Sequence, residues 1–554
     1  MDQHGRQGDL TRRDLLKLGS AAAAVGAGAH VLDLARPSAA DAQTPKRGGT
    51  FRLRSHVAPV HFDPHQTIAF STMIPLSFAY SRLVKVKAGS SVVPGTQPIE
   101  GDLAESWERQ GDTVYVFKLK KGVRWHAKPP VNGRELTAED VKYTYERFLT
   151  TKTNAANRAI LEMVDKIEAP DKYTVRFTLR EPNAWFVDRL ASTSTWVVAK
   201  ESVEKFGDLK SPESVVGTGP WMLQRYEPNV RISFVRNPSY FVPGLPYADG
   251  VEIVLSADPA AGFAAFLAGA FDFGPEYGMV IRRSDLEVAK GRVKGLGTRD
   301  YIVVFGGFTA MKLDQDPFKD VRVRRAVAMS DNWREVLETN AWSLGQGAPN
   351  PLIPAALKDW SIPIDQLPAE GRRLYEYNPG EAKRLLAEAG HPSGIKVPVE
   401  TTAGYGPDWM DAVQVALKNW KSAGIESDLK LKEYGAFVSS SLLGKFDRMM
   451  LTLRGGTTDP DTYFTQLLPG EALNSSGVND PKLTDMIKLQ RRTFDEKKRR
   501  EIVFDIQRYL SQQVYYAYSA SVSAVAAWMP YVKNFGPNIG HDYGGRLMVA
   551  WLDK

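Results

Sequence analysis

The segment of residues 395–434 constrains the fold more than any other part of the sequence. Residues 395–400 have the composition of a strand, residues 407–423 carry an apolar stripe at helical spacing, and residues 425–434 again have a strand pattern. Gly424 is a typical helix stop. A strand–helix–strand crossover places its two strands parallel in one sheet, so we expect an α/β protein.

The same pattern continues towards the C-terminus, with a helix predicted at residues 436–443 and a strand at residues 449–454. Ligands of open α/β sheets bind beyond the carboxyl ends of the strands. Two loops follow such ends here, residues 401–406 and 455–460, and both are rich in glycine and hydroxyl side chains. This composition suits a pocket that donates backbone N–H groups to a ligand, and it is equally typical of ordinary turns.

Local signals predict further elements on both sides of this segment. Thr137 and Asp140 form a capping box that begins one helix, and Asn378 followed by Pro379 begins another. A third helix is predicted from Pro317 towards residue 336. Strands are predicted at residues 50–54, 114–119, 174–179 and 231–236, the last pairing antiparallel with a strand after the turn at 217–220.

The N-terminal residues have the layout of an export signal. Arg12 and Arg13 precede a weakly apolar stretch, residues 18–34, and a small-residue triplet at 40–42 follows. The stretch is too short and too rich in Ala and Gly to be a good membrane span. We therefore predict a twin-arginine signal peptide, cleaved near Ala42, and a mature chain that is free in the periplasm.

Composition bounds the function classes. The 554 residues include 43% hydrophobic and 24% charged residues, which is the composition of a globular protein with more than one structural lobe. The net charge of +7 is spread along the chain, so nucleic-acid binding is not indicated. Cysteine is absent, which excludes disulfides, thiolate metal sites, a cysteine nucleophile and a lipid-carrying cysteine.

Motifs of catalysis and cofactor binding are mostly missing. The sequence contains no Gly-x-Ser-x-Gly, no His-Glu-x-x-His and no phosphate loop. Gly404 and Gly406 follow a strand and precede a helix, but Trp409 occupies the position of the third glycine of a dinucleotide fingerprint. We predict no cofactor and no resident metal.

Histidines and aromatic residues provide the remaining candidates. His56, His61 and His65 would permit metal ligation if their segment folded back, but Phe62-Asp63-Pro64 favours a turn instead. Trp342 and Tyr405 lie among small polar residues and are predicted to stack on an organic ligand. The other residues considered are expected to be packed, or have no evident partner: Trp185, Trp196, Trp221, His126 and His541.

Five sequence blocks occur in order along the chain, at residues 101–107, 121–126 with 132–141, 216–221, 317–326 and 377–386. Together they resemble the large periplasmic solute-binding proteins of peptide- and nickel-type ABC importers, solute-binding protein family 5. The resemblance covers nearly all of the mature chain. It implies a two-lobed α/β periplasmic binding protein fold, with an extra α+β subdomain in the first lobe and a ligand cleft between the lobes. It also implies that the chain itself catalyses no reaction.

The resemblance also implies how the protein works and how the chain divides. A small solute, a peptide or a peptide-like or opine-like compound, would be trapped by hinge closure and delivered unaltered to the membrane permease of the importer. The protein would act as a monomer with no membrane anchor. The implied division is a signal peptide at 1–42, a first lobe at 43–83, 201–304 and 519–554, its extra subdomain at 84–200, and a second lobe at 305–518.

Seven residues are predicted to contact the ligand, and one departure from the family affects them. In the peptide-binding members, a carboxylate four residues before the proline of the Asp-Pro loop pairs with the ligand's α-amine, whereas Gly456 stands there in this sequence. A buried ammonium without a partner is energetically costly, so this sequence supports a peptide with a free α-amine as ligand less strongly than the family does. Arg454 would suit an anionic ligand, and Asp459 would serve an amine from a shifted position. The predicted contact residues are Phe305, Trp342, Tyr405, Arg454, Gly456, Thr457 and Asp459.

Two alternatives remain at this point. A nickel or metallophore receptor of the same family would need His56, His61 or His65 in the cleft. An exported hydrolase on the same fold would need a nucleophile with a base beside it, and the chain has only eight histidines and no cysteine.

Overall fold

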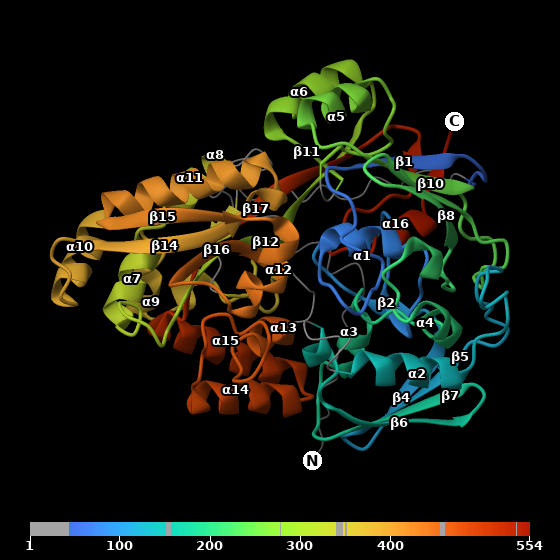
Figure 1. Ribbon diagram of the computed structural model, residues 1–554, viewed down its shortest axis with the longest axis horizontal. Helices are drawn as coiled ribbons and strands as arrows, with labels where there is room; N and C mark the ends of the chain where they lie inside the picture. Colours follow the sequence, from blue (N-terminus) through green and yellow to red (C-terminus); the bar gives the residue numbers. More distant parts are fainter. Residues whose placement is uncertain are drawn as a thin grey trace, which may run out of the picture. The chain divides into compact units, whose positions relative to one another are not determined.

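Three large sheets carry the fold of the described residues in this computed structural model, one of seven strands and two of four strands (Figure 1). The structure describes residues 44–150, 157–276, 279–339, 347–349, 352–454, 460–538 and 540–554. The predicted signal peptide, residues 1–42, lies outside these ranges. Residues Pro45–Lys554 form one compact unit.

The first four-stranded sheet contains the predicted antiparallel pair, which is confirmed. Its outer strand β1 runs parallel to β10, and the other neighbours are antiparallel. The turn before β8 packs against the backbone of Ala79 so closely that a Cβ on Gly217 or Gly219 would collide with it. Across the sheet the strands are β1 (Thr50–Ser55), β10 (Gly250–Leu255), β9 (Arg231–Arg236) and β8 (Trp221–Glu227).

The second four-stranded sheet is wholly antiparallel and is covered by helix α2, Ala138–Phe148. The predicted cap is present, because the backbone N–H of Thr137 donates to the Asp140 carboxylate at 2.8 Å. Side chains of α2 and of the sheet share one hydrophobic core. The strands, in order, are β4 (Ala104–Gln110), β5 (Val114–Leu119), β7 (Thr174–Leu179) and β6 (Val164–Asp171).

The seven-stranded sheet contains the predicted crossover. Strands β14 and β15 are parallel over their full length, and helix α11, Pro407–Ser422, connects them. Strand β16 is parallel to β14 and antiparallel to β12, so the sheet is mixed. Its order is β11 (Val280–Ile281), β17 (Tyr516–Trp528), β12 (Gly297–Met311), β16 (Met449–Arg454), β14 (Ile395–Thr402) and β15 (Ile425–Lys432), with β13 (Gly347–Pro349) also pairing with β17.

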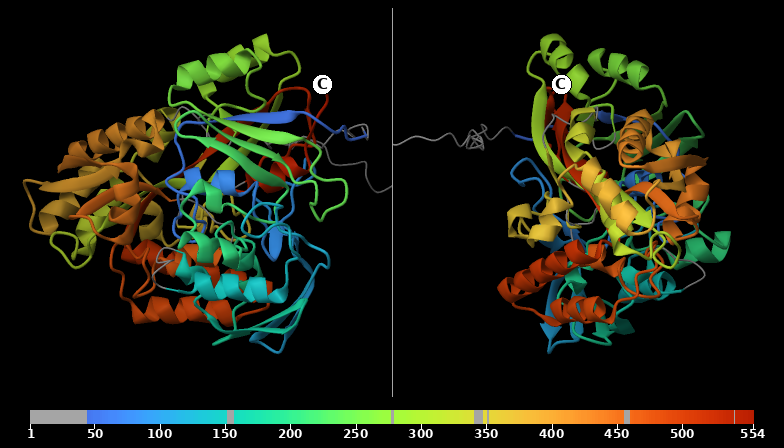
Figure 2. Two further views of the ribbon diagram at one scale, coloured as in Figure 1. Left: turned by 45° about the vertical axis from the view of Figure 1, so that its right-hand side comes forward. Right: turned by 90° about the vertical axis from the view of Figure 1, so that its left-hand side faces the viewer.

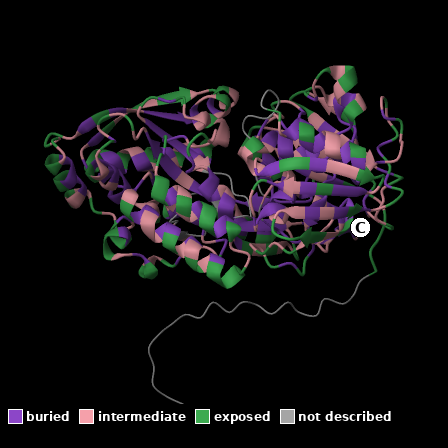
Figure 3. Ribbon diagram, turned by 90° about the horizontal axis from the view of Figure 1, so that it is seen from below, coloured by how far each residue is buried: buried purple, intermediate pink, exposed green. Residues whose placement is uncertain are grey.

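We call the part around the two four-stranded sheets the first lobe and the part around the seven-stranded sheet the second lobe. Along β16, Met450 packs into one core of the second lobe, whereas Met449 and Leu451 pack into the other, as expected for a sheet covered on both faces. Strand β17 places Val525 in a first-lobe core and Ala520 in a second-lobe core, so it runs between the lobes. Figure 2 shows this strand from two further directions, and Figure 3 shows buried residues gathered along the sheets.

The remaining elements connect and cover these sheets (Figure 1). Within the described ranges, no helix combines the length and the apolar character that crossing a bilayer requires. The other helices are α1 (Phe70–Leu76), α3 (Phe186–Leu190), α4 (Lys200–Phe206), α5 (Pro259–Leu267), α6 (Arg283–Arg292), α7 (Val321–Met329), α8 (Trp333–Thr339), α9 (Ala369–Arg373), α10 (Pro379–Glu388), α12 (Tyr434–Ser439), α13 (Pro460–Thr465), α14 (Pro481–Arg492), α15 (Glu496–Gln513) and α16 (Tyr543–Met548). The short strands are β2 (Val84–Val86), β3 (Ile99–Gly101), β18 (Val532–Lys533) and β19 (Trp551–Leu552).

Some local predictions were wrong in extent. The helix predicted at residues 436–443 is α12, which ends at Ser439, followed by a 3-10 turn at Ser441–Leu443. The single helix predicted from Pro317 is two helices, α7 and α8, because the Ser330 hydroxyl donates to the Ala326 carbonyl at the end of the first, and Asn332 accepts from the Glu335 N–H at the start of the second. The predicted loop 401–406 is shorter than expected. Its first two residues extend β14, and Ala403–Tyr405 form a 3-10 turn.

Candidate functional site

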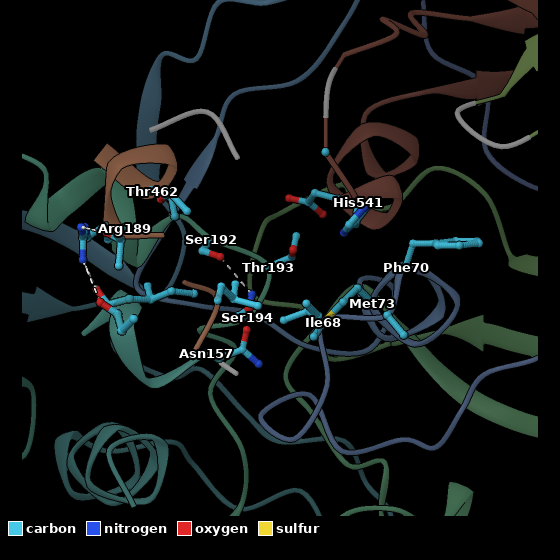
Figure 4. Close-up of a pocket in the computed structure, with 18 of the residues that line it drawn as sticks. Ile68, Phe70, Met73, Asn157, Arg189, Ser192, Thr193, Ser194, Thr462 and His541 are labelled. Carbon is cyan, nitrogen blue, oxygen red and sulfur yellow. Dashed lines mark hydrogen bonds between the residues drawn. The ribbon is translucent and has the colours of Figure 1, made fainter. Parts of the chain in front are cut away.

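A cavity of about 310 Å³ is lined by residues of both lobes. The first lobe contributes helix α1, the residues around and after α3, and the segment that leads into α16. The second lobe contributes β12, the turn after β14, α12, the end of β16 and α13. Figure 4 shows part of this lining. Among the lining residues are His56, Phe70, Asn157, Arg189, Ser192 and His541 of the first lobe, and Phe308, Tyr405, Tyr434, Leu453, Thr462 and Glu471 of the second.

Tyr405 is the one predicted contact residue whose side chain the structure describes, and it lines the cavity. Its hydroxyl lies 3.2 Å from the Thr452 Oγ1, and burial raises the pKa of Tyr405 to about 12. Phe305 lies in β12 and Arg454 ends β16, but their side chains are outside the description. The other four contact residues, Trp342, Gly456, Thr457 and Asp459, lie outside the described ranges, so those assignments stay predictions.

Aromatic rings from the two lobes meet at the cavity. The ring centroids of Phe70, on α1, and Tyr434, on α12, lie 6.1 Å apart. Tyr405 packs edge-on against Tyr434 at 5.7 Å and against Trp409 at 5.8 Å. Gly404 is required beneath this cluster, because a Cβ at that position would press into the Tyr434 side chain. The turn after β14 therefore positions its own tyrosine and the first residue of α12.

Two histidines of the lining are uncharged at neutral pH. Burial, followed by the charge of Arg54, lowers the pKa of His56 to about 4. Burial and the nearby Arg546 likewise lower the pKa of His541 to about 4. The buried Nε2 of His56 has no hydrogen-bond partner among the described groups. No sequence pattern indicated that His541 would reach the cavity, since its segment, residues 538–546, is remote in the chain from the other lining residues.

His61 and His65 have structural roles. His65 is buried, with Nδ1 2.7 Å from the Arg147 guanidinium and Nε2 3.0 Å from the Trp196 carbonyl. The Nδ1 of His61 accepts the Asp63 N–H at 3.1 Å, which is the predicted turn. Among the described residues, no group of three His, Asp or Glu side chains is arranged to hold a metal ion.

A buried ionic network joins the lobes at one end of the cavity. Asp461, on α13, accepts from the Arg189 guanidinium of the first lobe and from the Nε of Arg491, which lies 3.0 Å from both carboxylate oxygens. Gln490 also donates to Asp461. Arg189 further donates to the backbone carbonyl of Ala159 at 2.9 Å. Burial alone would raise the pKa of Asp461, but Arg491 and Arg189 together hold it below its ordinary value.

Trp185 reinforces the same contact between the lobes. Its indole N–H donates to the Gln490 amide oxygen at 2.8 Å, and its ring packs edge-on against Trp360 at 4.8 Å. The Arg499 guanidinium lies 4.5 Å from the Trp185 ring centre. Trp185 was expected in a core, and it is buried, but against the opposite lobe.

Glu471 and Glu162 form an acidic pair across the same boundary. Burial raises the pKa of Glu471 to about 8, and a hydrogen bond and charge repulsion from Glu162 act in the same direction. Arg491 lies 3.9 Å from Glu162 and moderates this repulsion. Sequence reasoning missed Arg189, Asp461 and both glutamates, because each is unremarkable in its own segment.

Comparison with known proteins agrees with this architecture. Residues 98–474 match the family described as "Bacterial extracellular solute-binding proteins, family 5 Middle". The dipeptide-binding protein of Escherichia coli K12 is 26% identical over 498 residues, covering 83% of this chain and 86% of that protein. Heme-binding protein A of Haemophilus influenzae is 26% identical over 455 residues, covering 77% of this chain and 78% of that protein.

Solved structures share the fold. The periplasmic binding protein DppA of Helicobacter pylori, in complex with the peptide STSA, has a TM-score of 0.78 at 22% identity, covering 92% of this chain and 99% of that chain. The binding protein AgaA of A. tumefaciens R10, in complex with agropinic acid, has a TM-score of 0.78 at 23% identity, covering 91% of this chain and 99% of that chain.

Proposed function

Because the chain belongs to family 5 of the bacterial extracellular solute-binding proteins, we propose that it captures a small solute for an ABC importer and releases it unaltered to the membrane permease. The observation that carries this proposal is the cavity of about 310 Å³ that both lobes line. The volume of this cavity is at the lower end of the range for small-molecule sites. Its walls are formed by the two lobes, so separation of the lobes would open it.

The proposed solute is a short peptide or an opine-like compound. Relatives support both classes, since their names record dipeptide binding in E. coli and agropinic acid binding in A. tumefaciens. His56 lines the cavity, but His61 and His65 are engaged in structural hydrogen bonds. No group of three metal-ligating side chains occurs among the described residues, so the metallophore alternative is not favoured. We retain as proposals the division of the chain stated above, a monomeric state, twin-arginine export and cleavage near Ala42.

We expect the full-length protein, purified without denaturation, to carry a solute that mass spectrometry detects after unfolding. Removing and restoring that solute should change the radius of gyration measured by small-angle X-ray scattering, because closure brings the two lobes together. The recovered solute should be chemically unchanged. A radius that stays constant with every bound solute contradicts capture by closure, and sustained conversion of the solute would favour an exported hydrolase.

A further inference from the structure

The cavity has two chemically different ends. In Figure 4, Arg189 and Thr462 lie at one end, Phe70 and Met73 lie at the other, and Ser192, Thr193 and Ser194 lie between them. The end with Arg189 is polar, and the end with Phe70 is the aromatic meeting point of the two lobes. A solute that fills this cavity must therefore present different chemistry at its two ends.

Two arginines of the lining are already matched by carboxylates of the protein itself. Arg189 is paired with Asp461, and Arg82 is paired with Asp542. His56 lies beside the aromatic end, with its ring centroid 5.6 Å from that of Phe70, and burial keeps it uncharged at neutral pH. An ionic group of a solute would have to compete with these existing partners, so charge recognition at these positions gains little.

The aromatic end, in contrast, offers surface that a solute can cover. Phe70 and Tyr434 approach from opposite lobes, and both are only half-buried in this structure. Ile68 and Met73 extend the apolar wall on the first lobe, and Leu442 extends it on the second. Apolar surface removed from water on closure favours the closed form in proportion to its area.

Building on the proposed function, we infer that this site selects solutes that carry one bulky apolar group, an aromatic ring above all. That group seats against the wall formed by Phe70, Tyr405 and Tyr434. The unpartnered Nε2 of His56 supplies one hydrogen bond to a polar atom beside the group. Phe70 and Tyr434 are then the specificity-determining residues, because burying a ring between the lobes directly stabilises the closed form.

The test is calorimetric titration of the full-length protein with four dipeptides, Ala-Phe, Ala-Leu, Ala-Ala and Ala-Asp. We expect Ala-Phe to bind at least about tenfold more tightly than Ala-Ala, with Ala-Leu between them, because burying a large apolar side chain is worth at least that factor. Ala-Asp should bind no better than Ala-Ala. Equal affinities for all four would overturn the inference while leaving solute capture intact.

Substitutions in the cavity wall identify the residues that produce the preference for Ala-Phe. Phe70→Ala and Tyr434→Ala should bring the Ala-Phe affinity down towards that of Ala-Ala, whereas Phe70→Leu and Tyr434→Phe should retain most of the preference. Phe206→Ala removes a half-buried ring outside the cavity, at the end of α4, and should leave all four affinities unchanged. A preference that survives both alanine variants, with folding verified by thermal melting, places the selective surface elsewhere and overturns the assignment.

If none of the four dipeptides binds, the chemistry of the solute that co-purifies with the protein decides whether the inference holds. A ring or branched apolar group in that solute supports the inference, and a uniformly polar solute overturns it. If no solute is carried and the lobes do not close with any compound tested, the proposed function itself fails, together with the inference that rests on it.

Discussion

Asp461→Ala is expected to lower the free energy of unfolding by about 3–5 kcal/mol, which is the usual cost of breaking a buried ion pair. Only 2% of the Arg189 side chain and 6% of the Arg491 side chain are exposed, so the substitution leaves two guanidinium groups buried without their carboxylate. Chemical denaturation at neutral pH measures the effect. Solute affinity should fall as well, because Arg189 and Asp461 belong to opposite lobes.

A matched control is available on the surface of the second lobe. Lys396 and Glu426 form an ion pair at 2.8 Å whose side chains are 68% and 62% exposed. Glu426→Ala should therefore leave the denaturation midpoint close to that of the unaltered protein, because exposed ion pairs contribute little to stability. Asp461→Asn should be intermediate, since it keeps a hydrogen-bonding group but loses the charge. If Asp461→Ala is no more destabilising than Glu426→Ala, the buried network does not stabilise this protein.

Solute binding is expected to weaken as the pH rises from about 6.5 to 8 and to become independent of pH above about 8.5. The pKa of Glu471 is raised to about 8 where it meets Glu162, whereas its ordinary value is 4.5. The closed form thus holds a proton that an opened, hydrated Glu471 would lose. The contribution of Glu471 protonation to the stability of the closed form is fully present below pH 4.5 and is lost as the pH rises through 8. The solute affinity falls by at most about tenfold per pH unit.

Other groups titrate outside this window. Burial raises the pKa of Asp188 to about 6, with the same sign but at lower pH. The pKa values of His56 and His541 are lowered to about 4, so their contribution to closure has the opposite sign, being complete above about pH 6.5 and lost as the pH falls towards 4. Arg491 and Arg189 oppose the upward shift of the Glu471 pKa.

Calorimetric titration of the bound solute at several pH values checks this expectation. Glu471→Gln removes the titrating carboxyl and should make the affinity independent of pH between about 6.5 and 8. Glu162→Gln removes the charge repulsion and should move the dependence to lower pH. An unaltered pH profile in Glu471→Gln would show that a different group controls closure.

Local signals predicted several elements of this fold because the causes of those elements are local. The strands β5, β7, β9 and β16 have the predicted bounds, since alternation and β-branched side chains mark them directly. The crossover of β14, α11 and β15 followed from periodicity and Gly424. The break between α7 and α8 was missed, because hydrogen bonds of single polar side chains, rather than the apolar period, end the first helix.

The site was far less predictable than the fold. Tyr405 was found because it follows a strand end, a position where ligands of α/β sheets gather. Arg189 and Asp461 are 272 residues apart and come from helices that show no unusual pattern, so nothing local pairs them. His541, Glu162 and Glu471 were not predicted as site residues for the same reason.

By itself, the sequence determined which segments become strands and helices, that the chain is α/β, and which family it resembles, because propensity, periodicity and capping act between near neighbours. Only the tertiary structure decided which charges are matched, which histidines are uncharged and where the aromatic rings of the two lobes meet. These properties depend on burial and on distances between residues remote in the chain, and folding alone creates both.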